Sequence, residues 1–179
     1  MGGVCHQLVQ FGMLEHLKAA LPFTDPSTIN RLLDLALYFG RQEIMDYLVQ
    51  TTTIRFSVRA IDVATHHGNL RLIDYVIGNC TLPREQARVA CFRLACAHGL
   101  IDVAKHLLES QSIRQLVPNY FDLLKVVIER CNNISTLQFL FQLWPPTPVL
   151  VLDCRRHLQR SSVQRLGHAT DDYLQSFVK

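Results

Sequence analysis

Charge is scarce in this sequence, and long apolar runs are absent. Charged residues make up 18% of the 179 residues, whereas hydrophobic residues make up 49%. This composition excludes an intrinsically disordered chain, which could not bury a core. No window approaches the roughly 18 consecutive apolar residues that a membrane-spanning helix needs, so no membrane span is expected. Scarce charge also predicts that much of the apolar area is buried or belongs to an interface.

Signals for export and for nucleic acid are missing as well. The opening "MGGVCHQLVQFG" has no basic segment followed by an apolar core, so no signal peptide is expected. The six cysteines form no regular framework, which favours free thiols in a reducing compartment. We therefore expect an intracellular protein, cytoplasmic or nuclear. A net charge of +3 does not indicate binding to nucleic acid or to an anionic membrane.

Glycine occurs only eight times, yet four glycines recur at a nearly constant spacing. Gly12, Gly40, Gly68 and Gly99 are followed by Asn132 at the fifth position, with steps of 28, 28, 31 and 33 residues. Helices often end on a residue with positive φ, which glycine adopts without strain and asparagine adopts second best. The spacing predicts five structural turns, each of which ends one helix and allows the next to begin.

The residues around these turns support helix pairs. A small residue stands four positions before three of the glycines, and apolar residues follow four, five, eight and nine positions after them, as on one face of a helix. The small residues are Ala36, Ala64 and Ala95. The clearest copies of the pattern span residues 32–50, 60–79 and 91–110, and fainter copies span 8–21 and 127–143. Asp25-Pro26 and Thr81 with Pro83 read as helix starts.

Helix pairs of about 30 residues cannot bury their apolar faces alone, but stacked pairs can. The sequence therefore predicts an all-α fold, an α-solenoid of about four to five helix-turn-helix repeats over residues 1–144. Residues 145–179 break the period. Pro145, Pro146 and Pro148 are expected to stop a helix, followed by a short apolar run and then a helix from Ser162. We expect this segment to be a helical cap of the stack; the alternative is a helix that docks a partner.

The repeat resembles a divergent ankyrin repeat over residues 4–143. The alanine, the glycine turn and the paired apolar positions match the second half of that family's motif. The first half departs from it, because the family's Thr-Pro-Leu-His falls on Arg31-Leu32-Leu33-Asp34 in one copy. The two short steps of 28 residues suggest that the projecting β-hairpin is trimmed to a loop. Another helix-hairpin solenoid, of HEAT or TPR type, is the alternative fold.

The resemblance implies a non-catalytic adaptor or scaffold that binds another protein. Degenerate arrays of this kind occur in ordinary eukaryotic proteins and in effectors of viruses and intracellular bacteria that act in the host cytoplasm. In this family the residues before each turn line a concave face and contact the partner. The corresponding candidates are Tyr38, Phe39, His66, His67, Arg93 and His98. Under the alternative interpretation, the aromatic side chains pack beneath neighbouring loops and the histidines are merely solvated.

Other classes of function find weaker support. Adjacent helical residues such as His66 and His67 point about 100° apart, and no Cys-x-x-Cys occurs, so no metal or other cofactor is expected. Cys96 and His98 are two apart on a helix and do not face each other, which disfavours a thiol enzyme. Asp34, Asp62 and Arg93, each six before a turn, form no basic stripe for nucleic acid. A nucleic-acid-binding solenoid and a thiol enzyme remain the alternatives, and no catalytic residue is assigned.

Overall fold

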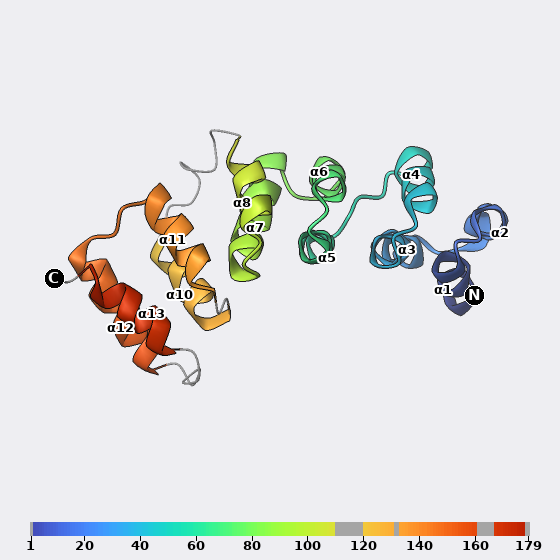
Figure 1. Cartoon of the computed structure of the whole chain (residues 1–179). Coiled ribbons are helices and arrows are strands. Elements are labelled where there is room, and N and C mark those ends of the chain that lie inside the picture. Colours follow the sequence, from blue (N-terminus) through green and yellow to red (C-terminus); the bar gives the residue numbers. More distant parts are fainter. Residues whose placement is uncertain (1, 110–119, 131–132, 161–166, 178–179) are drawn as a thin grey trace. The chain divides into compact units, whose positions relative to one another are not determined.

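The structure, a computed structural model, describes residues 2–109, 120–130, 133–160 and 167–177, and in this part the chain is all-helical (Figure 1). The prediction of an all-α fold is therefore confirmed for these residues. No strand occurs among them, and their one β feature is an isolated parallel bridge between Phe56 and Cys80. The helices are α1 (Gly2–Phe11), α2 (Leu14–Ala20), the 3-10 helix η1 (Leu21–Phe23), α3 (Pro26–Tyr38), α4 (Gln42–Thr51), α5 (Val58–His67), α6 (Leu70–Gly78), α7 (Arg84–Ala97), α8 (Ile101–Leu108), α10 (Tyr120–Arg130), α11 (Ile134–Leu143), α12 (Pro148–Arg160) and α13 (Gly167–Gln175).

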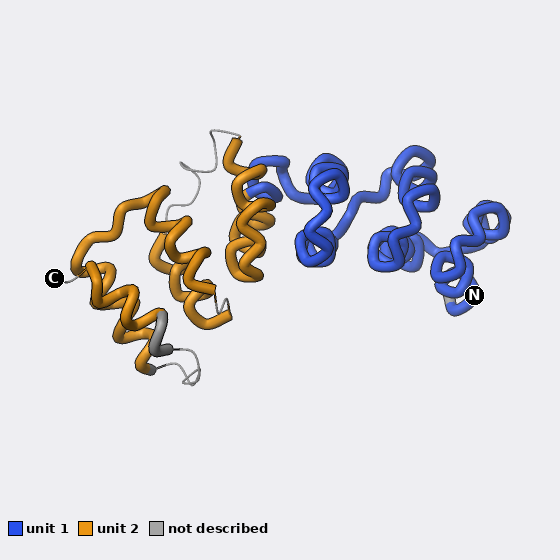
Figure 2. The backbone as a smooth tube through the Cα atoms, viewed as in Figure 1, with its two compact units in different colours: residues 1–88 blue, residues 89–179 orange. Residues whose placement is uncertain are grey.

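The helices pack as pairs within two compact units, residues 1–88 and 89–179 (Figure 2). In the first unit α1 packs with α2, α3 with α4, and α5 with α6. The first helices of these pairs also contact one another, α1 with α3 and α3 with α5. In the second unit α10 packs with α11 and α12 with α13, while α12 also contacts α10 and α13 contacts α11. Stacked helix pairs are thus present within each unit.

Four glycines close the first helix of a pair. Gly12, Gly40, Gly68 and Gly99 have φ values of 73°, 65°, 66° and 73°, in the left-handed region that L side chains rarely adopt. After three of them the next N–H returns to the carbonyl five residues earlier, as in a Schellman motif. These hydrogen bonds join Met13 to Leu8, Arg41 to Ala36 and Leu100 to Ala95, each at 2.8 Å. The predicted fifth turn, at Asn132, lies outside the described residues.

After Gly68 the chain has a side-chain cap in place of the Schellman hydrogen bond. Asn69 is the N-cap of α6, and its side-chain oxygen accepts the N–H groups of Arg71 at 3.1 Å and Leu72 at 3.3 Å. The segment "HHGN" therefore ends α5 with a left-handed glycine and starts α6 with a capping asparagine. In the structure this hinge is a turn between two helices.

Small and apolar side chains fill the interior of the first unit. Ala36 and Ala64, one turn before their glycines, are completely buried, which lets neighbouring helices approach closely. The apolar positions after each turn point inward as well. Those buried on α4 and α6 are Ile44, Met45, Leu48, Ile73, Val76 and Ile77. The apolar stripes of the sequence are thus the faces that bury the core.

Two contacts tie the pair α5–α6 to its surroundings. The Asp34 carboxylate on α3 accepts the Ser57 N–H at 3.2 Å and also accepts the Ser57 hydroxyl, which joins α3 to the start of α5. Phe56 donates its N–H to the Asn79 carbonyl at 2.9 Å and accepts the Thr81 N–H at 3.0 Å. This parallel bridge joins the segment before α5 to the segment after α6, beside the fully buried Phe56 ring.

The start of the C-terminal segment corrects one expectation. α11 ends at Leu143, before the prolines, as expected. The short apolar run after them, for which no helix was expected, belongs to the helix α12, which begins at Pro148 itself. Proline suits the first position of a helix, because its missing N–H has no partner there in any case. The hydroxyl of Thr147, immediately before it, accepts the Leu150 N–H at 3.3 Å, as a capping residue does.

The predicted helix from Ser162 corresponds to α13, which the structure places at Gly167–Gln175; residues 161–166 lie outside the described part. Leu174 is buried, and the rings of Tyr173 and Phe177 lie 6.0 and 5.3 Å from that of Phe141 on α11. The apolar face of α13 thus packs against α11 of the same chain.

Arg155 on α12 is half-buried and takes part in a salt bridge. Its guanidinium pairs with Asp171 of α13 at 2.6 Å, and this contact ties α12 to α13. Helices α12 and α13 therefore form a further helix pair, with α12 packed on α10 and α13 on α11.

Candidate functional site

Helices α1, α3 and α5 each carry exposed aromatic or histidine side chains just before a glycine turn. Phe11 is 68% exposed and Tyr38 is 62% exposed, while His66 and His67 are exposed at the corresponding positions of α5. Phe39 is half-buried, and its ring meets that of Tyr38 edge-on at a centroid distance of 5.2 Å. Because α3 packs against both α1 and α5, these positions belong to three neighbouring helices. We call these five residues the turn row.

The structure brings together four of the six residues that the sequence singled out for partner binding. Tyr38, Phe39, His66 and His67 all belong to the turn row of the first unit. The other two, Arg93 on α7 and His98 just after it, are exposed and belong to the second unit. They form a separate pair of exposed polar side chains.

Phe11 is the member of the turn row that sequence reasoning missed. A signal for it was present, since Phe11 stands one residue before Gly12, as Phe39 stands before Gly40 and His67 before Gly68. The first copy of the repeat is weaker than the three copies around Gly40, Gly68 and Gly99, because fewer of its positions match the pattern. The structure shows that this first position carries a more exposed ring than any other aromatic residue of the row.

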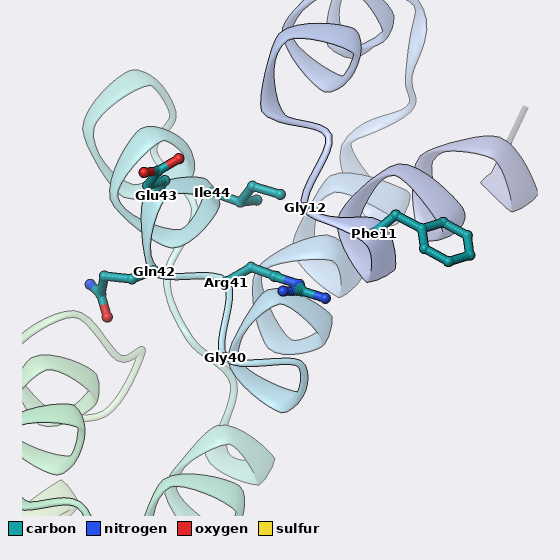
Figure 3. A pocket seen from close by; sticks show the side chains of 7 residues that line it. All are labelled: Phe11, Gly12, Gly40, Arg41, Gln42, Glu43 and Ile44. Atoms are coloured by element: carbon teal, nitrogen blue, oxygen red, sulfur yellow. The ribbon is translucent and has the colours of Figure 1, made fainter.

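A recess lies beside the first two turns, next to Phe11 (Figure 3). It has a volume of about 310 Å³ and is lined by Phe11, Gly12, Gly40, Arg41, Gln42, Glu43 and Ile44. The Arg41 guanidinium donates to the Gln10 carbonyl from Nε at 3.1 Å and from Nη2 at 2.6 Å. A cation is favourable at the carboxyl end of a helix, so Arg41 both fastens the end of α1 and brings positive charge to the recess.

Two alternatives, a metal site and a thiol enzyme, depend on where the described residues place histidine and cysteine side chains. No group of three or more His, Cys, Asp or Glu side chains among them could hold a metal ion. Cys96 is buried whereas His98 is exposed, so the two side chains of the thiol-enzyme hypothesis occupy different environments. No helix in this part of the chain is both long enough and apolar enough to cross a membrane.

The turn row consists of aromatic and histidine side chains. Aromatic rings have few rotatable bonds, and tyrosine and phenylalanine are enriched in protein interfaces relative to the rest of the surface. Comparisons with protein families, with curated proteins and with solved structures return no match for this chain.

Proposed function

We propose that this protein is a non-catalytic interaction module of ankyrin type that binds another protein through the turn row. One observation carries the proposal: three neighbouring helices bear exposed aromatic or histidine side chains within the last two positions before a glycine turn. A soluble helix gains nothing in stability from exposing a phenylalanine or a tyrosine ring. A repeated exposure at one structural position is therefore typical of a binding surface.

The recess beside Phe11 refines the chemistry of the partner. Phe11 and Arg41 both line this recess, so an aromatic side chain and a guanidinium lie beside one concave surface. This combination suits a partner segment that presents an apolar anchor followed by a carboxylate, because Arg41 has donors in addition to those used by Gln10. The partner that we propose is accordingly a protein segment of this chemistry.

Affinity capture from cell extract tests the proposal. The double variant Phe11→Ala/Tyr38→Ala removes the two most exposed rings of the row and little buried area, so its unfolding midpoint should stay close to that of the wild type. We expect captured protein to fall by at least about tenfold, since interface aromatics typically contribute more than 1 kcal/mol each. Capture is quantified by mass spectrometry against the wild-type bait.

Val58→Ala is the matched control. Val58 is exposed in the same unit, at the start of α5, but is not part of the turn row. This variant should capture the same proteins as the wild type. Equal capture by the double variant and the control would refute the proposed site. Recovery of nucleic acid that disappears at raised salt would favour the solenoid that binds nucleic acid, and selective labelling of Cys96 by a thiol-reactive substrate analogue would favour an enzyme.

A further inference from the structure

The outward sides of α3 and α5 carry side chains of the same character in the same order. Nine residues before its glycine turn, each helix has an exposed arginine. A half-buried apolar residue stands five before the turn, and a member of the turn row stands two before it. These residues are Arg31, Leu35 and Tyr38 on α3, and Arg59, Val63 and His66 on α5. Residues three and four apart are neighbours on a helix surface, so each set forms one stripe.

The two stripes lie side by side. α3 contacts α5, and the two helices occupy neighbouring places in one layer (Figure 1). The second helices repeat their contacts in one register, because Lys18 lies 5.4 Å from the centre of the Tyr47 ring, and Asp46 is hydrogen-bonded to the Tyr75 hydroxyl. Each contact joins the sixth residue after one glycine turn to the seventh residue after the next. Consecutive helix pairs are therefore stacked in the same orientation, which places the two arginines next to each other.

Together the stripes form a patch of about 10 Å by 10 Å. Seven residues of helix rise by about 10 Å, and the axes of packed helices lie about 8–10 Å apart. The two guanidinium groups mark one end of the patch, Tyr38 and His66 mark the other, and Leu35 and Val63 lie between them. α3 has a neighbouring first helix on both sides, α1 and α5, and the patch occupies a side that neither covers. We call these six residues the α3–α5 patch.

The arginines give the patch positive charge that the chain does not neutralise. Among the residues that the structure describes, neither Arg31 nor Arg59 has an ion-pair or hydrogen-bond partner for its side chain. Two carboxylates share this side of the helices. That of Asp34 is half-buried and is bound by the N–H and hydroxyl of Ser57, whereas Asp62 is exposed. Two guanidinium groups thus face one exposed carboxylate, and the planar guanidinium is well matched to binding a further carboxylate.

We propose that the α3–α5 patch binds an acidic, amphipathic segment of the partner protein. An apolar side chain of that segment is seated on Leu35 and Val63, and its carboxylates pair with the two arginines. This inference rests on the proposed function, because the patch includes two residues of the turn row, and it names the chemistry of the partner. A nucleic acid fits less well, since residues 1–88 carry eight Lys or Arg and eight Asp or Glu, and a phosphate backbone offers no apolar group for the centre of the patch.

Fluorescence anisotropy of labelled peptides with the full chain tests the proposal. The probe is a helical peptide of about 15 residues, made of leucine, glutamate and alanine, with the leucines on one side and the glutamates beside them. We expect saturable binding that weakens with added salt. Arg31→Gln/Arg59→Gln should weaken binding at least about fivefold, because two ion pairs are lost, and each single variant should lie in between. All three variants should melt like the wild type, since neither arginine has a partner within the described chain.

Arg55→Gln/Arg71→Gln is the matched control. Both residues are exposed in the same unit but lie outside the patch, and the double variant changes the net charge by the same amount. It should bind the probe as the wild type does. Two control peptides, one with lysine in place of glutamate and one with serine in place of leucine, should bind more weakly than the probe.

Four outcomes would overturn the proposal: no saturable binding of the acidic peptide, equal binding of the lysine peptide, equal binding by the two double variants, or tighter binding of a thymidine oligonucleotide. Capture from cell extract separates this inference from the proposed function. If Phe11→Ala/Tyr38→Ala loses captured proteins while Arg31→Gln/Arg59→Gln keeps all of them, the turn row binds a partner that is not acidic. If both variants capture what the wild type captures, both proposals fail.

Discussion

At the scale of single residues, the left-handed glycines show how backbone conformation constrains the sequence. A Cβ added at Gly68 would meet no atom within 4 Å, so any penalty for a side chain there comes from φ and not from a clash. Gly68→Val should therefore destabilise the fold by about 1–3 kcal/mol, because a β-branched residue is poorly suited to positive φ. Chemical denaturation measures this. Gly78→Ala is the control: Gly78 ends α6 without positive φ, also in open space, and its replacement should be neutral or slightly stabilising. Equal midpoints for Gly68→Val and the wild type would contradict the turn geometry.

A second residue, Asp25, makes the start of α3 sensitive to pH. Hydrogen bonds from the Ser27 hydroxyl and from the hydroxyl and N–H of Thr28 hold the pKa of the Asp25 carboxyl well below its ordinary value. A carboxyl whose pKa is depressed by folding stabilises the fold above its unfolded pKa of about 3.9 and loses that contribution as the pH falls through the folded value. Asp25→Asn keeps a capping side chain but removes the titration. The melting temperature of the wild type should exceed that of Asp25→Asn at neutral pH, and the difference should shrink as the pH falls below about 4. A difference that stays constant with pH would contradict this role.

At the scale of elements, the contact between Asp34 and Ser57 shows how one helix pair is positioned on the next. Asp34 lies on α3 at the place where the ankyrin motif has histidine, and its carboxylate binds both the N–H and the hydroxyl of the residue before α5. Asp34→Ala should destabilise by about 1–2 kcal/mol, because the Ser57 N–H loses its partner. Ser57→Ala removes only the hydroxyl bond and should cost less. A double-mutant cycle should give a coupling energy of about 0.5–1.5 kcal/mol. Strict additivity would show that the two residues do not interact.

The helix α12 provides a test of the C-terminal packing. Burial raises the pKa of the Cys154 thiol to about 12, and only the thiolate reacts with alkylating reagents. Near pH 8 we expect Cys154 to stay unlabelled in the native protein, whereas the half-buried Cys80 is modified and both react after unfolding. Peptide mapping by mass spectrometry resolves the two sites. Native labelling of Cys154 as fast as Cys80 would mean that α12 is not packed on α10.

At the scale of the whole molecule, the features that can be predicted from the sequence are those encoded by residues close together in the chain. A glycine turn and the apolar stripe after it are written within about 15 residues, so the helix pairs around Gly40 and Gly68 can be predicted without a structure. The start of α12 is harder to predict, because proline both breaks a helix and suits the first position of one, as Pro148 does here. The bond from Asp34 to Ser57 joins residues 23 apart, and nothing in the local sequence predicts it. Phe11 could be predicted only by aligning the first and weakest copy of the repeat on Gly12.

The division into two compact units makes a prediction about how local damage spreads. Helix pairs in stacked arrays contact only their neighbours, so a local loss of stability declines with distance along the stack. In Gly68→Val, native-state hydrogen exchange should speed up most in α5 and α6, less in the contacting helix α3, and least in α12 and α13 of the other unit. Mass spectrometry of exchanged peptides from the variant, the wild type and Gly78→Ala measures the gradient, and the Gly78→Ala map should match the wild type. A uniform increase over residues 1–88 and 89–179 would show that the chain unfolds as one cooperative body, because both units would then open in a single step.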